Sequence, residues 1–265
     1  MDSNKKNICT ACGTQYPSNI NTPELCPICN DDRQYIPENG QTWTNFDELS
    51  DNYSVIAKKL NNNLYELRMT PSFAIGQRAL LVLAPGGNIL WDCIALVNEP
   101  VIEFIKSKGG LKAIAFSHPH YYSTMNYWAE VFNCPVYIHQ NDEQWVFNRG
   151  SHVSLWVGTE KELRDGIRII NTGGHFPGSS ILHVPFLSPQ GAVLCGDTFA
   201  ISPSKKHISA MYSYPNRIPL PLHEMQRLKK QMDPIPFDTM YGYADFLNIY
   251  LNAKELFENS MAKYI

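Results

Sequence analysis

The chain has no run of apolar residues approaching the roughly 20 that a membrane-spanning helix requires. It also lacks an excess of positive charge, since 22 lysines and arginines stand against 25 aspartates and glutamates, a formal net charge of −3. That balance provides neither the basic surface of a nucleic-acid-binding protein nor a polybasic membrane patch. The first residues, Met1 to Asn7, are polar and contain no apolar segment typical of a signal peptide. We therefore predict a cytoplasmic protein without nucleic-acid or membrane partners.

The sequence shows no internal repeat and no low-complexity tract. Hydrophobic residues make up 44% of it and charged residues 18%, which fits a globular protein with a sizeable core. At 265 residues the chain has room for one large domain and one small one.

Seven cysteines are present, and in a cytoplasmic protein they are expected to be thiols or metal ligands rather than disulfides. Four of them form two Cys-x-x-Cys pairs separated by 13 residues: Cys9 with Cys12, and Cys26 with Cys29. Each pair brings two sulfur atoms to one ion, and four thiolates complete a tetrahedral site. The residues between the pairs are mostly turn formers, so metal binding would supply the folding energy of this small segment. We predict a four-cysteine module with its linker in residues 1–40 and a main domain in residues 41–265.

The segments Cys12-Gly13 and Pro23 to Cys29 resemble the knuckles of rubredoxin-type domains, especially the small domain of rubrerythrins. That resemblance leaves iron possible, because four thiolates accept either metal. Zinc is favoured, since nothing else in the sequence resembles an electron-transfer partner. Free thiols and a redox pair are the alternatives, and a contact with another protein is a possible role. Residues 31–46, with several turn formers, are predicted to be a linker.

Periodicity predicts a main domain that contains both strands and helices. Strands are expected at residues 64–69, 77–83, 88–92, 113–116, 135–139, 153–157, 167–171, 181–185 and 192–195. Helices are expected at residues 97–107, 127–132, 222–232 and 253–262. The succession strand, helix, strand around residues 113–139 predicts a βαβ unit and hence an α/β fold.

Candidate metal ligands follow three of these strands. His118 and His120 come directly after the apolar run at 113–116, and side chains at i and i+2 of an extended chain point to the same side. His175 is presented by a Gly-rich turn, and Asp197 follows the strand at 192–195 within Gly-Asp-Thr. The alternative for the first pair is a His-Pro-His turn with solvated rings.

These three motifs resemble those of the metallo-β-lactamase superfamily. The resemblance implies a four-layer αββα sandwich with a small four-cysteine zinc-ribbon or rubredoxin-like module in front of it. It also implies that His118, His120 and His175 bind one metal ion and that Asp197 corresponds to the carboxylate that usually bridges two. Tyr122 and Ser123 stand where the family has its motif aspartate and third histidine, and no histidine follows Asp197 at the family's last ligand position.

The departures from the family pattern predict one ion at this site instead of two. Three neutral imidazoles and one water molecule make an open zinc site, in which the pKa of the water falls to about 7. Asp197 would then act as a ligand or as the general base. Tyr122 or Tyr243 would donate a hydrogen bond to a developing oxyanion, and the alternative for both is aromatic packing in the place of the missing second metal site. The expected activity is hydrolysis of a small ester, thioester, lactone or amide.

Two other functions remain open at this level. The missing family ligands favour a catalytically weak or inactive protein that binds a ligand or another protein. A redox protein with a di-iron site is a third possibility, against which the same losses argue. Among the remaining histidines, His139 is predicted to lie at the surface at the end of a strand.

Overall fold

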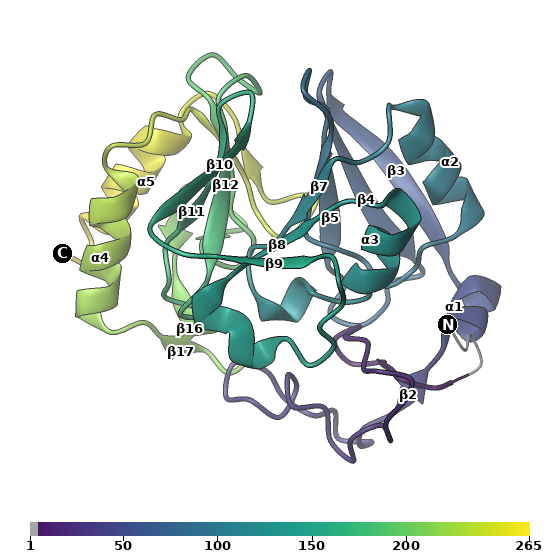
Figure 1. Ribbon diagram of the computed structural model, residues 1–265. Helices are drawn as coiled ribbons and strands as arrows, with labels where there is room; N and C mark the ends of the chain where they lie inside the picture. The colour runs from purple at the N-terminus through teal and green to yellow at the C-terminus, as the bar shows by residue number, and fades with distance from the viewer. Residues whose placement is uncertain (1–4) are drawn as a thin grey trace.

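The computed structural model describes residues 5–265, so most of the polar start that we examined for a signal peptide, Met1 to Asn4, lies outside the described residues. Two twisted sheets face each other in the main domain (Figure 1). The first sheet has seven strands, in the spatial order β3 (Ser54–Asn61), β4 (Leu64–Thr70), β5 (Arg78–Val82), β6 (Ile89–Trp91), β7 (Ala113–Ala115), β8 (Val136–His139) and β9 (Val153–Trp156).

The second sheet has six strands and continues the chain directly from the first. Their spatial order is β10 (Glu160–Arg164), β11 (Ile167–Asn171), β12 (Ser180–Val184), β13 (Ala192–Leu194), β18 (Thr239–Tyr241) and β19 (Asn248–Ile249). Strands β6 to β9 are parallel, as are β13 and β18, and the remaining neighbours in both sheets are antiparallel.

Helices cover the outer face of each sheet (Figure 1). On the side of the first sheet lie α2 (Glu99–Ser107) and α3 (Met125–Phe132), and on the side of the second lie α4 (Leu222–Met232) and α5 (Ala253–Met261). The predicted αββα sandwich is therefore confirmed. A shorter helix, α1 (Phe46–Asn52), begins after Asn45, whose side chain accepts a hydrogen bond from the backbone of Glu48.

Alternating side chains divide the interior into three apolar layers. In β5, Ala79 and Leu81 pack toward α2 and α3, whereas Leu80 and Val82 face the second sheet. In β13, Val193 packs toward α4 and α5, while its two neighbours face the first sheet. Because successive side chains of a strand point to opposite faces, short strands that are buried on both faces can serve two cores at once.

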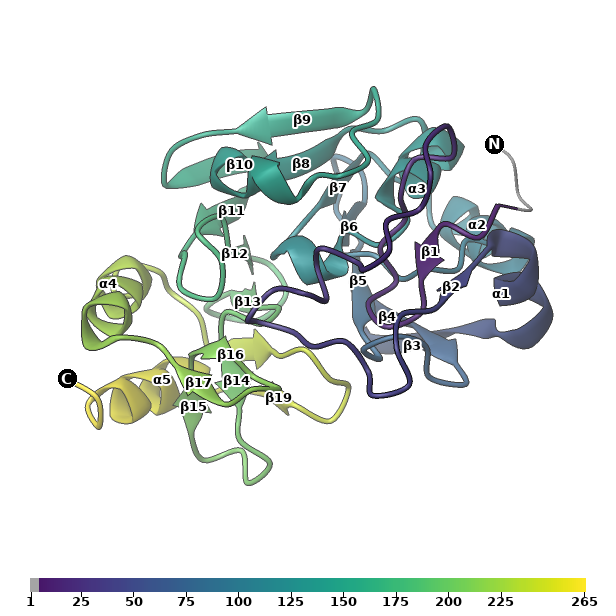
Figure 2. The ribbon, with the colours of Figure 1, turned by 90° about the horizontal axis from the view of Figure 1, so that it is seen from below.

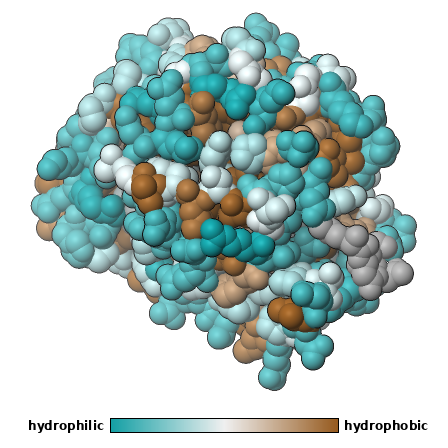
Figure 3. All heavy atoms as spheres, in the orientation of Figure 1, coloured by the Kyte–Doolittle hydropathy of each residue, from teal (hydrophilic) through white to brown (hydrophobic). Residues whose placement is uncertain are grey.

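Short two-residue and three-residue strands connect β13 to α4. They form two antiparallel pairs, β14 (Ala200–Ile201) with β15 (Ile208–Ser209) and β16 (Met211–Ser213) with β17 (Ile218–Pro219). Among residues 5–265 no helix combines the length and hydropathy needed to cross a membrane. The face seen in Figure 3 mixes hydrophilic and hydrophobic residues.

The four-cysteine module runs across one end of the sandwich, at the ends of the strands that carry the candidate ligands (Figure 2). Its first strand, β1 (Ile8–Cys9), pairs with β2 (Trp43–Thr44), so this pairing crosses the predicted boundary between residues 40 and 41. Ile8 is fully buried in the core beneath α2 and α3. The domain boundary stays a prediction, and the module shares apolar contacts with the main domain.

Candidate metal centre

A change in backbone conformation after β7 positions the first two histidines. His118 is still extended, with φ −172° and ψ 171°, and the 3-10 turn η1 (Pro119–Tyr121) starts directly after it. Proline suits the first position of such a turn, because its φ is already fixed there and its missing N–H needs no partner. Both imidazoles are 2% exposed, so the predicted pair is buried and not solvated.

A tight loop between β11 and β12 presents the third histidine. Gly173 and Gly174 have φ of +61° and +84°, conformations that side chains with a Cβ rarely adopt, and a Cβ on Gly173 would collide with the guanidinium of Arg227. The buried Asp142 closes the loop from outside by accepting a hydrogen bond of 2.6 Å from the backbone of Gly178. His175 is thus held at 2% exposure by a loop with little freedom.

The four candidate ligands converge. One donor atom from each of His118, His120, His175 and Asp197 lies within 4.8 Å of the other three. His118 Nε2 is 3.3 Å from Asp197 Oδ2, and His175 Nε2 is 3.4 Å from His120 Nδ1. Ligands bound at about 2.0–2.1 Å in a tetrahedron lie about 3.3 Å apart. These distances fit the ligands of one ion, although the separation of 3.9 Å between His175 Nε2 and Asp197 Oδ2 is wider.

The remaining ring nitrogens identify which atoms face the site. His175 Nδ1 lies 2.8 Å from the backbone oxygen of Tyr212, and His118 Nδ1 lies 2.8 Å from Ser117 Oγ. These contacts leave the Nε2 atoms of both rings for the ion, and His118 Nε2 is buried without a hydrogen-bond partner. A buried polar atom of this kind is costly unless it has a ligand, so the residues fit a metal ion.

The electrostatics of the site favour neutral rings at His120 and His175 beside an ionised carboxylate at Asp197. Burial, reinforced by the nearby charge of His118, lowers the pKa of His175 to about 3 and holds the pKa of His120 well below its ordinary value. For Asp197, burial alone would raise the pKa, but its attraction to the histidines outweighs burial and the pKa lies below its ordinary range. Neutral imidazoles and a carboxylate are the forms that bind a metal ion.

Ser117 connects the site to a carboxylate beneath it. Asp92 Oδ1 accepts hydrogen bonds from the backbone N–H of Ser117 at 2.8 Å and from its hydroxyl at 2.9 Å, and the same hydroxyl contacts His118 Nδ1. This chain of contacts orients the His118 ring so that its Nε2 points toward Asp197 and the other candidate ligands.

Replacing Ser117 with alanine should therefore weaken metal binding at the histidine site by about 10- to 100-fold, because a metal-binding imidazole loses the group that orients it. The measurement is zinc affinity by competition with a coloured chelator. Ser107→Ala is the matched control, since Ser107 is exposed at the end of α2 and its hydroxyl donates to the backbone oxygen of Phe104. Equal affinity in both variants would contradict this role.

Tyr121 and Tyr122, although adjacent in sequence, lie in different surroundings. Tyr121 donates a hydrogen bond of 2.8 Å to Asp197 Oδ1, and its ring lies 4.4 Å from that of His118. Tyr122, the predicted oxyanion donor, is 3% exposed in the apolar core, with its ring 5.1 Å from that of Phe116. The sequence analysis missed Tyr121, because the family motif assigns no role to that position.

Ser123, at the position of the family's third histidine, contacts the four-cysteine module. Its hydroxyl donates to the backbone oxygen of Gly13 at 3.2 Å, and its own backbone oxygen accepts from Gln15 at 3.1 Å. A position that binds a second ion in the family pattern thus connects the four-cysteine module to the main domain in this chain.

The four cysteines of the module form the second candidate site. All are buried, and two Sγ–Sγ distances, from Cys9 to Cys29 and from Cys12 to Cys26, are 3.7 Å. Four sulfur ligands at about 2.3 Å from a tetrahedral ion lie about 3.8 Å apart, so the spacing fits one ion. Gln41 Nε2 donates to Cys9 Sγ at 3.1 Å, as expected for a thiolate acceptor. The structure therefore contains two groups that could each bind a metal ion.

A pocket of about 520 Å³ opens above Asp197. Of the four candidate ligands at the histidine site, Asp197 is the one that lines it. The main domain contributes Ala74, Ile75, Tyr121, Asp197, Tyr214, Pro215 and Tyr243, and the four-cysteine module contributes Thr10, Ala11, Gln34, Tyr35 and Pro37. This volume is typical of sites for small molecules.

The whole chain resembles one curated protein closely. It is 38% identical over 261 residues to the uncharacterized protein YmaE of Bacillus subtilis strain 168, covering 97% of this chain and 95% of that protein. The chain belongs to the YmaE family. No family model matches it.

Solved structures similar to this YmaE-family chain include metallo-β-lactamases. The DIM-1 metallo-β-lactamase has a TM-score of 0.58 at 14% identity, covering 80% of this chain and 97% of the other. The metallo-β-lactamase FIM-1 from Pseudomonas aeruginosa, in its mono-zinc form, has a TM-score of 0.56 at 13% identity, with 79% and 94% covered. At these identities the likeness shows the fold, which is the one expected from the sequence.

Proposed function

We propose that this YmaE-family chain is a metal-dependent hydrolase of a small ester, thioester, lactone or amide. The observation that carries the proposal is the convergence of three buried imidazoles on Asp197, a carboxylate that lines a pocket of small-molecule size. A divalent ion held by His118, His120 and His175 would polarise a carbonyl group and lower the pKa of a water molecule. We propose zinc for this ion and for the one in the four-cysteine module.

Asp197 has two roles open to it at this site. Its Oδ2 atom faces the histidines at distances that suit a fourth ligand, and zinc can extend its coordination to five during a reaction. Its side chain also remains 16% exposed toward the pocket, where it could accept a proton from an attacking water molecule. Both roles need an ionised carboxylate, which the lowered pKa provides.

Tyr121 is proposed as a positioning residue for Asp197. Burial raises its pKa well above the ordinary value, so its hydroxyl keeps the proton that it donates to Asp197 Oδ1. The hydrogen bond fixes the plane of the carboxylate and turns Oδ2 toward the histidines. Tyr243, which lines the pocket and is 39% exposed, is better placed than Tyr122 to contact a substrate.

One ion, not two, is proposed for the histidine site. Within residues 5–265, the side chains of His, Cys, Asp and Glu gather into two groups that could hold an ion, and one of these is the cysteine group. Two residues that bind a second ion in the metallo-β-lactamase pattern are replaced here by Tyr122 and Ser123. Tyr122 packs in the core, and Ser123 contacts the module.

The test is hydrolysis by the full chain, loaded with two equivalents of zinc, of a panel comprising an aryl acetate, an aryl thioacetate, a γ-lactone and an anilide. Saturable turnover of at least one class is expected, with loss of turnover when a chelator removes the ion and recovery when zinc is restored. Absence of turnover across the panel with both ions bound would contradict the proposal and favour a ligand-binding protein.

A further inference from the structure

We propose that the four-cysteine module is one wall of the substrate pocket and that this wall selects uncharged, partly apolar acyl groups over anionic ones. This inference rests on the proposed hydrolase function for its chemistry, but its argument concerns binding. It gives the module a role in recognition within the chain itself.

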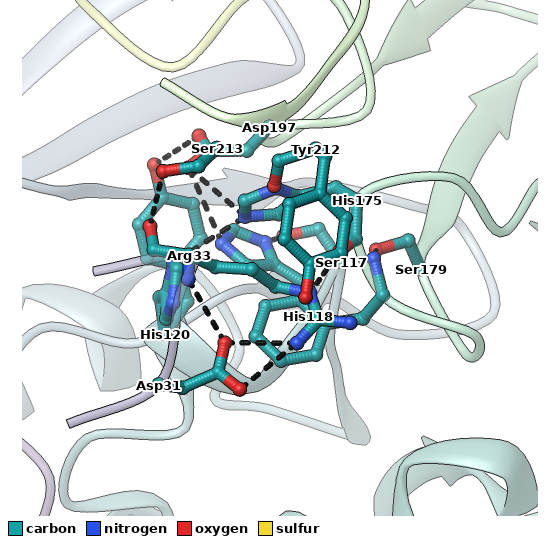
Figure 4. A network of polar contacts seen from close by, with 12 residues as sticks. Asp31, Arg33, Ser117, His118, His120, His175, Ser179, Asp197, Tyr212 and Ser213 are labelled. Atoms are coloured by element: carbon teal, nitrogen blue, oxygen red, sulfur yellow. Dashed lines mark hydrogen bonds and ion pairs between the residues drawn. The ribbon is translucent and has the colours of Figure 1, made fainter. Parts of the chain in front are cut away.

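The side of the module nearest the histidines is held by Arg33 (Figure 4). Its guanidinium lies between the rings of Phe176 and Tyr212, 4.4 and 4.3 Å from their centroids, and its Nε donates to the backbone oxygen of His175. Stacking of a guanidinium between two rings adds to a hydrogen bond that is already directional. The segment that carries Gln34 and Tyr35 is therefore fixed relative to the metal centre.

Asn216, on the turn after β16, holds the same segment from the other side. Its Nδ2 donates to the backbone oxygens of Asp32 and Gln34, both at 2.9 Å, and Ser213 donates to the backbone of Arg33 at 3.1 Å. Residues 32–34, within the segment 31–46 that was predicted to be a linker, are thus docked by several hydrogen bonds to His175, Ser213 and Asn216.

The knuckle of the first cysteine pair makes a second contact. Gly13 has φ +82°, and a Cβ there would lie 3.2 Å from Ser123 Oγ, so the close approach depends on glycine. Because Gly13 follows Cys12 directly, an ion held by the four cysteines would fix both the knuckle and its contact with Ser123. The position of the wall is coupled in this way to the ion in the module.

The side chains that line the pocket carry negative charge and no positive charge. Among the lining residues Asp197 is the one side chain that is charged at neutral pH, and they include no lysine or arginine. Arg33 lies behind the wall and is paired with Asp31, whose carboxylate oxygens are 2.8 and 3.0 Å from its Nη1. An anionic group placed against the wall would lose water there without gaining a cationic side chain.

The pocket lining contains apolar and aromatic side chains and no cationic one. Tyr35 and Pro37 of the module lie on one side of the pocket, and Ile75, Tyr214 and Tyr243 belong to the main domain. Aromatic rings and prolines favour an aliphatic or aromatic group over a solvated one. The wall thus favours uncharged acyl groups for two reasons: it has no cationic side chain, and it presents apolar surface.

Two esters that differ only at the end of the acyl chain test this selectivity. Phenyl butanoate and phenyl hemisuccinate carry a methyl group and a carboxylate at the same position, and hydrolysis of each consumes one water and releases phenol and the acid. The zinc-loaded full chain should hydrolyse phenyl butanoate with a kcat/KM higher by about 10- to 100-fold, as expected when a group loses its hydrogen bonds on burial. Equal values would overturn the proposal while leaving the hydrolase function intact.

A cation added to the wall should reverse this preference. Gln34→Arg is expected to raise kcat/KM for the hemisuccinate by about tenfold or more and to leave the metal content at two equivalents. Gln190→Arg is the matched control, because Gln190 is exposed in the turn before β13 and does not line the pocket. If Gln34→Arg fails to fold, Tyr35→Arg serves instead, since Tyr35 is 58% exposed. No change in the ratio with either folded variant would overturn the proposal.

Binding of the corresponding ketones distinguishes a failure of the hydrolase proposal from a failure of the wall proposal. Phenyl propyl ketone and 4-oxo-4-phenylbutanoate have similar shapes to the esters but cannot be hydrolysed, and their binding to the full chain is measurable by NMR. If neither ester is hydrolysed but the uncharged ketone binds more tightly, and Gln34→Arg reverses that order, the wall is supported and the hydrolase proposal fails. Tighter binding of the anionic ketone to the unaltered chain would contradict the proposed selectivity of the wall.

Discussion

Replacing His120 with alanine is expected to remove one of two equivalents of metal and to reduce kcat/KM by at least about 10³-fold. The imidazole is 2% exposed, its Nδ1 is 3.4 Å from His175 Nε2, and burial keeps it neutral. Without it the site retains two imidazoles and one carboxylate, and the several kcal/mol that a Lewis acid supplies are lost with the ion. The measurements are metal content by mass spectrometry and turnover of the best ester.

His223→Ala is the control for this change. His223 lies near the start of α4 with its side chain 76% exposed, and it is no member of either ligand group. Both equivalents of metal and full turnover should remain. Retention of two equivalents by the His120 variant would show that the imidazole is no ligand, and retention of activity without the ion would exclude a metal-dependent mechanism.

Replacing Cys12 with alanine is expected to remove the other equivalent and to unfold the four-cysteine module while the sandwich stays folded. Structural zinc contributes an apparent binding free energy of about 10–16 kcal/mol in zinc-finger peptides, far more than the few apolar contacts of this module can replace. Limited proteolysis should then cut within residues 8–40, and the remaining fragment should still contain one equivalent of metal. The preference for phenyl butanoate over the hemisuccinate should fall as the wall is lost.

Cys134→Ala is the matched control, because Cys134 is 2% exposed in the core of the main domain and lies outside the cysteine group. It should lower the stability of the sandwich without changing the metal content or exposing the module to protease. If the Cys12 variant kept two equivalents and an intact module, the cysteine site would not be the source of the module's stability.

The two groups of candidate ligands could be predicted from the sequence because each residue depends on local chemistry. Two Cys-x-x-Cys pairs need only their spacing, and His118, His175 and Asp197 each follow an apolar strand whose period is visible in the sequence. The order of strands and helices also follows from periodicity, and the resemblance to metallo-β-lactamases supplied the layers that periodicity cannot give.

The errors come from contacts between distant residues. Strand β3 was not predicted, because as the edge strand of its sheet it is exposed on much of its length, with Lys58 and Lys59 in place of an apolar alternation. His139 was predicted at the surface but is 7% exposed, since β8 lies between two other strands and the ring bonds the backbone of Gly158. The role of Tyr121 depends on the 3-10 turn, which directs it and not Tyr122 toward Asp197.

The hydrogen bonds of Arg33 have a consequence for the order in which the chain folds. Its Nε bonds a residue 142 positions later, and its backbone oxygen bonds one 180 positions later. At a synthesis rate of about 5–20 residues per second, the module leaves the ribosome on the order of 10 s before Ser213 does. During that interval the four cysteines can already hold an ion, whereas Arg33 has no rings to lie between. The nascent module would then depend on its own few contacts and on the metal that it binds, so a shortage of that metal would act during synthesis, before the sandwich has formed.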